Sequence, residues 1–299
     1  MTLSRDPLVS VIIPCFNMGR CLDEAVSSVT AQTYPAIEIV ITDDGATDGE
    51  TLASLRRQEE AGITVLRQAN AGPAAARNAA LRVARGEFFM PLDDDLIEPP
   101  YIEEAVRAMA EDPELGIVYC RAEMFGSVSG EWRLPHFNYP YHLLWNAIFA
   151  CALFRREDWQ TVGGYNEDLK GREDHDFSLR ILGLGRTVHR LEGVYFRYRR
   201  GRPHSVNDAI HARSARDRMI STYATMFRTN RRVYLDHAED FFTGIFAVVD
   251  ERNELYQRYR HLEKLRRSRL GSAGLALLKS FYRHPRLSRR SSAEAGRGQ

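Results

Sequence analysis

The chain has 299 residues, of which 44% are hydrophobic and 27% charged, a composition that is typical of a globular enzyme and excludes disorder over the whole chain. The net charge of +1 hides an asymmetry, because residues 252–299 hold 13 Lys or Arg against three acidic residues, a charge of +10. Residues 1–251 therefore carry −9, which argues against nucleic acid as a partner of this body.

Neither the cysteines nor the apolar runs indicate secretion or a membrane span. The four cysteines lack CxxC spacing and the density of a disulfide framework, which fits a reducing compartment. The apolar run at 143–154 is far shorter than the roughly 20 residues of a membrane span, and the first residues lack a signal-peptide cleavage site. We expect a cytoplasmic protein, and leave open a peripheral contact of the basic tail with the inner face of the membrane.

Strand and helix patterns alternate along the first hundred residues. Apolar, β-branched or aromatic runs predict strands at 9–14, 37–44, 63–68 and 87–92. Helical spacing predicts helices at 21–32, 51–61 and 73–84, the last with Pro73 at its first position. Such repeats predict right-handed crossovers and an α/β fold, with a mainly parallel sheet flanked by helices.

Candidate ligand-binding residues lie at the ends of three of the predicted strands. They are Pro14, Phe16 and Asn17 after the first strand, Asp43 and Asp44 after the second, and Asp93, Asp94 and Asp95 after the fourth. Ligands of parallel sheets bind at the carboxyl ends of strands, so these residues predict one site. Adjacent carboxylates repel each other, so the two acidic clusters favour a bound cation that is shared with a phosphorylated ligand. The alternative for the second loop is a plain polar loop with a helix cap at Thr47 or Asp48.

The turn after the first strand limits the kind of ligand. It reads PCFNMGR, and contains neither the GxGxxG of dinucleotide-binding folds nor the GxxxxGK[ST] of nucleoside triphosphatases. A sugar nucleotidyltransferase would have a glycine-rich turn with basic residues there. That class remains as an alternative function, as does a non-catalytic subunit that binds nucleotide or carbohydrate.

Six motifs follow one another between about Val9 and Asn207. They are VSVIIPCFN, VITDDGATDG, NAGPAAARNAAL, GEFFMPLDDD, VGGYNEDL and REDHDFSLRI. In this order and spacing they resemble the family 2 glycosyltransferases of the GT-A fold, with a Rossmann-like nucleotide-binding half. The resemblance implies metal-dependent, inverting transfer of a sugar from a nucleoside diphosphate sugar, with UDP-sugar as first choice. The implied acceptor is a hydroxyl of a glycan or a lipid-linked molecule, as in surface polysaccharide synthesis.

The resemblance also assigns roles to the residues at the strand ends. Its nucleotide-binding positions are Pro14, Phe16, Asn17, Asp43, Asp44, Arg77, Asp93 and Asp94. Asp93 and Asp95 match the fixed carboxylates of a DxD motif that would hold Mg²⁺ or Mn²⁺, and His204 is a further candidate metal ligand. The alternative for Arg77 is a charge on a helix surface.

Glu173 and Asp174 match the acidic pair of the family, and we predict Asp174 as the general base. A hydroxyl is a poor nucleophile near neutral pH and gains from a carboxylate that takes its proton. The alternative role of Asp174 is an ordinary helix cap or helix-dipole partner. One base opposite the leaving group implies inversion, because retention through a covalent intermediate needs a second nucleophile that the motifs do not show.

The segment 123–157 is rich in aromatic residues that could stack on sugar rings or fill a core. They include Trp132, Phe137, Tyr139, Tyr141 and Trp145. Beyond the motifs, 212–230 and 240–265 predict helices. We expect a GT-A domain at 1–212, a helical C-terminal extension at 213–287 and a disordered tail at 288–299.

Overall fold

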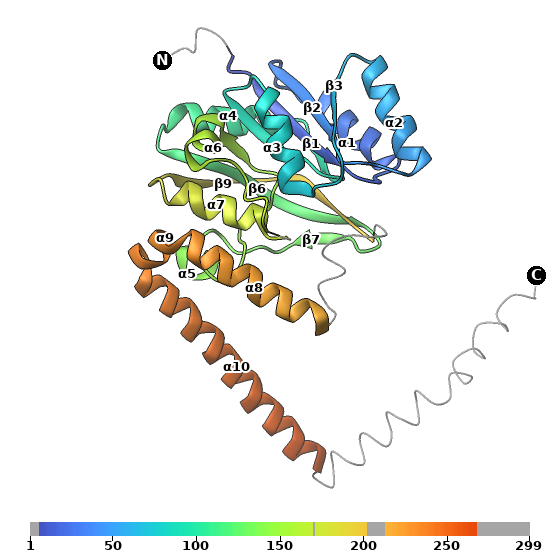
Figure 1. The fold of residues 1–299 in the computed structure, drawn as a ribbon. Helices are drawn as coiled ribbons and strands as arrows, with labels where there is room; N and C mark the ends of the chain where they lie inside the picture. Colours follow the sequence, from blue (N-terminus) through green and yellow to red (C-terminus); the bar gives the residue numbers. More distant parts are fainter. Residues whose placement is uncertain (1–5, 170, 202–212, 268–299) are drawn as a thin grey trace, which may run out of the picture. The chain divides into compact units, whose positions relative to one another are not determined.

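The structure is a computed structural model that describes residues 6–169, 171–201 and 213–267 (Figure 1). By their internal contacts the residues form two compact units, Met1–Phe242 and Thr243–Gln299. The expected functional boundary at residue 212 stays a prediction. None of the four cysteines forms a disulfide. Within the described ranges, every helix is too short or too polar to span a membrane.

The first half of the sheet is the predicted parallel array. Its strands lie in the order β3-β2-β1-β4, and Val9 is in register with both Ile37 and Phe88. The strands are β1 (Val9–Cys15), β2 (Ile37–Asp43), β3 (Thr64–Arg67) and β4 (Phe88–Pro91). The helices between them are α1 (Cys21–Thr30), α2 (Gly49–Glu60) and α3 (Pro73–Val83). The alternation of strand and helix is confirmed, with Asp48 as N-cap of α2 and Pro73 in the first turn of α3.

The second half of the sheet mixes directions and continues the order as β4-β8-β6-β9-β5, with β7 on β6. β6 and β9 pair in parallel, while β5, β7 and β8 run antiparallel to their neighbours. The strands are β5 (Leu96–Ile97), β6 (Leu115–Gly126), β7 (Gly130–Trp132), β8 (Leu153–Arg155) and β9 (Thr187–Arg200). Over the described sheet, four strand pairs are parallel and four are antiparallel, so the prediction of a mainly parallel sheet holds for β1 to β4, and the sheet as a whole is mixed.

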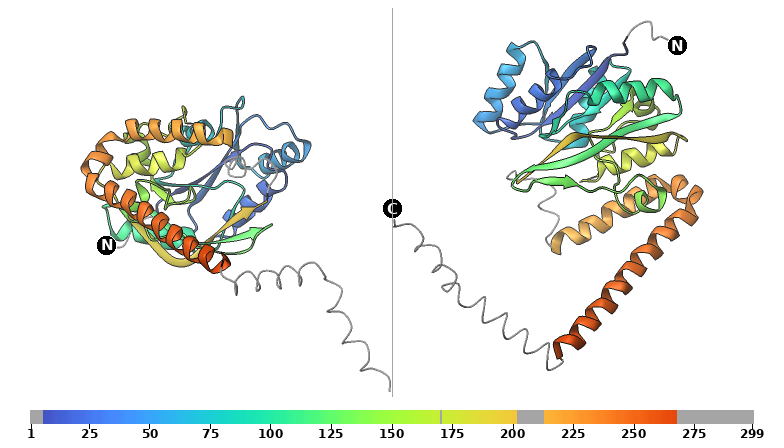
Figure 2. Two further views of the ribbon diagram at one scale, coloured as in Figure 1. Left: turned by 90° about the horizontal axis from the view of Figure 1, so that it is seen from below. Right: turned by 180° about the vertical axis from the view of Figure 1, so that it is seen from behind.

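Helices cover both faces of this half. They are α4 (Tyr101–Glu111), α5 (Tyr139–His142), α6 (Arg156–Val162) and α7 (Glu173–Leu182). Figures 1 and 2 show α6 and α7 on one face of β6 and β9, and α4 on the opposite face. Aromatic side chains pack α7 against its neighbours. The ring centroid of Phe177 lies 5.2 Å from that of Phe154 in β8 and 4.3 Å from that of Tyr165. The core thus fixes the first turn of α7 beside the sheet.

The helices after β9 begin with α8 (Arg213–Thr229) and α9 (Arg231–Asp236), followed by α10 (Ala238–Arg267). The helices predicted at 212–230 and 240–265 are confirmed, and α9 was not predicted. α8 and α9 pack on α7 through a second apolar cluster that includes Leu179, Met226 and Val233. A buried Asn230 Nδ2 donates to Asp176 Oδ1 at 2.8 Å and adds a polar link. The first unit therefore includes α8 and α9.

Candidate active site

The loops after β1 and β2 are joined by side-chain hydrogen bonds. Asn17, at φ 49°, accepts hydrogen bonds at Oδ1 from the backbone N–H of Thr47 (2.8 Å) and of Asp48 (3.3 Å). Beside it the ring of Phe16 is 42% exposed, while Pro14 belongs to β1. This end of the sheet therefore presents an accessible aromatic face over a fixed loop pair.

Asp43 and Asp44 are both buried and serve as acceptors for backbone groups. Asp43 Oδ1 accepts from Ala46 N at 2.8 Å. The Asp44 carboxylate accepts from Gln68 Nε2 (2.8 Å), Ala71 N (2.8 Å) and Gly72 N (2.9 Å). These bonds hold the turn that leads into α3. Direct contact of the two aspartates with a nucleotide stays a prediction.

Arg77 joins the acidic loop after β4 to the start of α7. It is only 2% exposed; its Nη1 donates to Glu173 Oε1 at 2.6 Å and its Nη2 to Asp93 Oδ1 at 2.9 Å. The alternative of a helix-surface charge is therefore wrong. Burial alone would lower the pKa of Arg77, yet the charges of Asp93 and Glu173 raise it well above its ordinary value. One buried cation thus ties the DxD loop to the acidic pair.

The acidic loop itself is held from β9. Asp95 is 6% exposed and accepts from Arg199 N at 2.7 Å, while Arg199 Nε donates to the carbonyl oxygen of Asp94 at 2.6 Å. Burial, followed by the charge of Asp94, raises the pKa of Asp95 well above its ordinary value. A negative charge at Asp95 is thus unfavourable without a compensating cation.

No group of three His, Cys, Asp or Glu side chains within the described ranges is arranged as a ready metal site. Asp93 turns its carboxylate toward Arg77, and Asp95 lies in the interior of the same loop. His204 lies outside the described residues. Asp93 and Asp95 therefore remain a partial, two-residue donor set.

Asp174 stands in the first turn of α7 with its carboxylate partly exposed. The N-cap of α7 is Arg172 at φ 65°, so Asp174 is not the helix cap, whereas its place in the first turn agrees with the alternative of a helix-dipole partner. Asn146 Nδ2 donates to Asp174 Oδ2 at 2.8 Å. Burial raises the pKa of Asp174, and the nearby charge of Arg77 opposes that shift. The Asp174 carboxylate is thereby oriented by Asn146, and its role as general base stays a prediction.

The sequence did not identify Asn146, whose amide orientation is fixed by a second bond. Its Oδ1 accepts from Ile148 N at 3.1 Å, which leaves Nδ2 to face Asp174. The segment around it is fastened to α7, since His175 Nε2 donates to His142 O at 2.6 Å. Only the position of Asn146 within the aromatic segment could have drawn attention to it.

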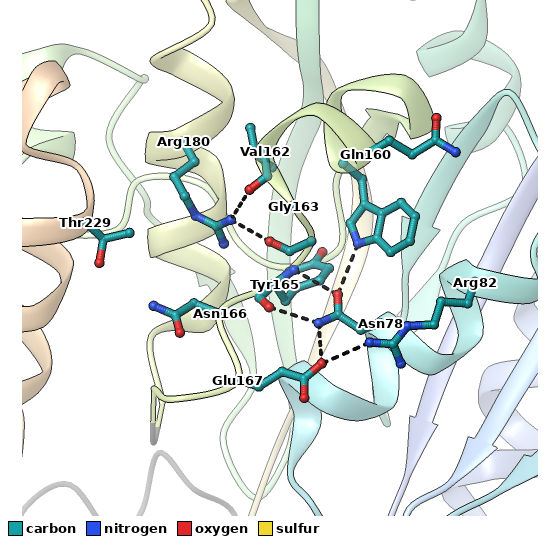
Figure 3. Close-up of a pocket in the computed structure, with 12 residues that line it drawn as sticks. Asn78, Arg82, Gln160, Val162, Gly163, Tyr165, Asn166, Glu167, Arg180 and Thr229 are labelled. Atoms are coloured by element: carbon teal, nitrogen blue, oxygen red, sulfur yellow. Dashed lines mark hydrogen bonds and ion pairs between the residues drawn. The ribbon is translucent and has the colours of Figure 1, made fainter.

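The VGGYNEDL loop is bound to α3 by Asn78, the neighbour of Arg77. Figure 3 shows the cavity along this loop, in which Asn78 Oδ1 accepts from Trp159 Nε1 (3.1 Å) and Tyr165 N (2.8 Å). Asn78 Nδ2 donates to Tyr165 O at 2.9 Å. A Cβ on Gly164 would lie 2.8 Å from Asn78 Oδ1, so the close approach needs glycine. The loop is therefore a rigid support of the site.

The five aromatic residues singled out from the segment 123–157 have different surroundings. Trp132 stacks on Tyr198 at 4.5 Å, and Tyr139 stacks on His237 at 3.6 Å. Trp145 is 45% exposed, while Phe137 and Tyr141 are half-buried. Trp145 is thus the most exposed of the five.

With the site described, the chain can be compared with known proteins. A sequence model of glycosyl transferase family 2 matches residues 10–171. The chain is 30% identical over 213 residues to a chondroitin synthase of Escherichia coli, an alignment that covers 69% of this chain and 31% of that protein. It is 29% identical to a hyaluronan synthase of Pasteurella multocida, with 67% and 21% covered. The chain thus spans about a third or less of these relatives.

Solved structures show the same fold. TarS of S. aureus (residues 1–349) in complex with UDP-GlcNAc has a TM-score of 0.59 at 19% identity, and covers 77% of this chain and 72% of that one. A mannosyltransferase of Pyrobaculum calidifontis in complex with GDP-Man and Mn²⁺ has a TM-score of 0.58 at 22% identity, with 94% and 82% covered. Both the fold and the family expected from the six motifs are confirmed. Since the family model matches residues 10–171, more than half of the chain, the chain belongs to glycosyl transferase family 2 and has the GT-A fold.

Proposed function

We propose that this glycosyltransferase is inverting and metal-dependent, and moves a sugar from a nucleoside diphosphate sugar to a hydroxyl of a glycan or lipid-linked acceptor in surface polysaccharide synthesis. UDP-sugar is the first choice of donor. The support is the donor named in the TarS complex, UDP-GlcNAc, and the two synthases among the relatives. A contact of the basic C-terminal tail with a membrane is part of the expectation and concerns mainly residues outside the described ranges.

The observation that carries this proposal is the double ion pair of Arg77. Its guanidinium bonds Asp93 of the acidic loop and Glu173, the neighbour of Asp174, at 2.9 and 2.6 Å. The group that would receive the diphosphate and the group that would activate the acceptor are therefore parts of one buried network. Carboxylates on unconnected surfaces could not serve a single displacement.

Asp93 and Asp95 fit a divalent cation by the chemistry of their donor set. Hard divalent ions prefer oxygen ligands and complete their shell with substrate phosphates, so a partial protein set is ordinary. Burial raises the pKa of Asp95, and the charges of Asp94 and Asp93 add to that shift, so a bound cation would stabilise its ionised form. When bound, Mg²⁺ or Mn²⁺ would neutralise charge on the departing diphosphate. A role of His204 as a ligand stays a prediction.

The donor side would hold the nucleotide by the end of the parallel sheet. Pro14, Phe16 and Asn17 would line the base, for which Phe16 offers an exposed ring. Asp43 and Asp44 organise the loops around it. Arg77 acts through Asp93 in the described structure, and its direct contact with the nucleotide, like that of Asp94, stays a prediction.

Asp174 would take the proton of the acceptor hydroxyl while the hydroxyl oxygen bonds to the anomeric carbon. In the same step the bond from the anomeric carbon to the diphosphate oxygen breaks. The hydrogen bond from Asn146 holds one carboxylate oxygen, so that the carboxylate keeps a fixed orientation. Attack opposite the leaving group inverts the anomeric configuration. Glu173 neutralises Arg77 and supports the turn that carries the base.

Asp174→Asn tests the proposal. The amide cannot accept the proton, so transfer should fall at least about 100-fold, while stabilisation by UDP-GlcNAc with Mn²⁺ in a thermal-shift assay should persist. Asp236→Asn is the matched control, because Asp236 is exposed and pairs only with Arg232 among the described residues. Full turnover by Asp174→Asn, or a product of retained configuration by NMR, would contradict the mechanism. Release of pyrophosphate from a nucleoside triphosphate and sugar phosphate would instead support the nucleotidyltransferase alternative.

A further inference from the structure

An exposed aromatic ring lies next in sequence to the residue that orients the base. Trp145 is 45% exposed, and the following residue, Asn146, bonds Asp174 at 2.8 Å. Two hydrogen bonds fix the backbone of this stretch: Trp145 N donates to Tyr141 O at 2.8 Å, and His142 O accepts from His175 Nε2. The ring of Trp145 is thus held on the acceptor half of the site.

Tyr223 of α8 comes to the same place from a distant part of the chain. Its ring lies 6.5 Å from Trp145 and 6.2 Å from His175, each in an edge-to-face arrangement. Burial raises the pKa of Tyr223. The charge of Arg172 opposes this shift, and the charge of Asp174 adds to it. Tyr223 therefore lies between the exposed indole and the first turn of α7.

Two buried polar atoms beside the base have no hydrogen-bond partner among the described residues. They are the Oη of Tyr223 and the Nε of Arg172. Arg172 also has a left-handed backbone at φ 65°, which costs a residue with a side chain about 1 kcal/mol. A buried polar group without a partner costs about 1–3 kcal/mol, so such groups usually meet water or a ligand. Their position beside Asp174 points to a polar ligand.

We propose that Trp145, Tyr223 and Arg172 form an acceptor subsite that binds a sugar ring next to Asp174. A sugar has an apolar face of C–H groups that packs on an indole and a rim of hydroxyls that bond phenol and guanidinium groups. The acceptor is therefore a glycan whose terminal sugar carries the attacked hydroxyl. A lipid alcohol has one hydroxyl for these two polar atoms and no ring face for the indole of Trp145. This inference rests on the proposed function and names the acceptor class of the same site.

The test measures transfer of the sugar from UDP-GlcNAc, in the presence of Mn²⁺, to a panel of methyl glycosides. The panel contains the glycosides of glucose, galactose, glucuronic acid and N-acetylglucosamine. Hydrolysis of the donor by water is measured as the competing reaction. Trp145→Ala should raise the KM for the best glycoside about tenfold and lower the ratio of transfer to hydrolysis to a similar extent. Trp145→Phe should recover most of this loss, since it keeps an aromatic face. Tyr223→Phe should lower kcat/KM for the glycoside about three- to tenfold.

Phe227→Ala is the matched control, because Phe227 is 44% exposed on the same helix and contacts Tyr234 and Phe241 instead. An unchanged glycoside KM in Trp145→Ala would overturn the subsite, as would an equal fall of transfer and hydrolysis. A wild-type enzyme that uses none of the glycosides would overturn the acceptor class. These failures differ from failure of the proposed function, which would appear as full activity of Asp174→Asn.

Discussion

The donor half and the acceptor half of the site differ in how their polar groups are connected. In the donor half, Asp44 accepts three hydrogen bonds from the residues just before α3, and Asn17 bridges two adjacent loops. In the acceptor half, Tyr223 and Arg172 keep buried polar atoms without a described partner. Thr42 Oγ1 and Asp48 Oδ2 in the donor half also lack a partner among the described residues, so the two halves do not differ in saturation. They differ in that the donor loops are bonded to each other, whereas the unpaired atoms of the acceptor half belong to side chains near Asp174.

The largest test of this comparison removes the residue that joins the two halves. Arg77→Met should lower the free energy of unfolding by about 3–5 kcal/mol, because Asp93 and Glu173 lose their buried partner. Urea unfolding measures the change. Arg82→Met is the control on the same helix, since the Arg82 side chain is 62% exposed and should change stability by less than about 0.5 kcal/mol. Equal effects of the two variants would mean that the halves are not coupled through Arg77.

A second test addresses the buried histidines under the acceptor half. Burial lowers the pKa of His175 to about 4, against 6.5 when unfolded. Between these two pH values the unfolded chain binds a proton at His175 and the folded chain does not. The free energy of unfolding should therefore fall by up to about 3 kcal/mol as pH drops from 6.5 to 4. Buried carboxylates with raised pKa values oppose this trend, so the measurement is the difference from His175→Gln. Parallel stability curves for the two proteins would exclude the effect.

The smallest expected effect concerns the donor half. Asp44→Asn places an amide N–H against at least one backbone N–H donor, which should cost about 1–3 kcal/mol of stability and weaken binding of UDP. Chemical denaturation and calorimetry measure the two quantities, with the exposed Asp236→Asn as reference. Weakened UDP binding without loss of stability would show a direct contact of Asp44 with the nucleotide. If neither quantity changes, the hydrogen bonds to Asp44 contribute neither to stability nor to UDP binding.

Local pattern predicted the first half of the fold and not the details of the second. β1 to β4 and their helices follow periodicity and turn chemistry that lie within each segment, such as the N-cap Asp48 and Pro73. The ion pairs of Arg77 could not be predicted, because its partners Asp93 and Glu173 are 16 and 96 residues away. Asn146 and Tyr223 were missed for the same reason, since only tertiary packing brings them to Asp174. The separate helix α9 also depends on packing, through buried Val233 and Tyr234.

The position of α8 has a consequence for diversification within the family. The segment that matches the family model ends at residue 171, whereas Asp174 and Tyr223 both lie beyond it. Under the proposed function, a chimera that takes only α8 from a relative should retain donor choice while changing the acceptor sugar, because β9 and Arg199 stay in place. Exchange of that one helix would be a short evolutionary route to a new acceptor.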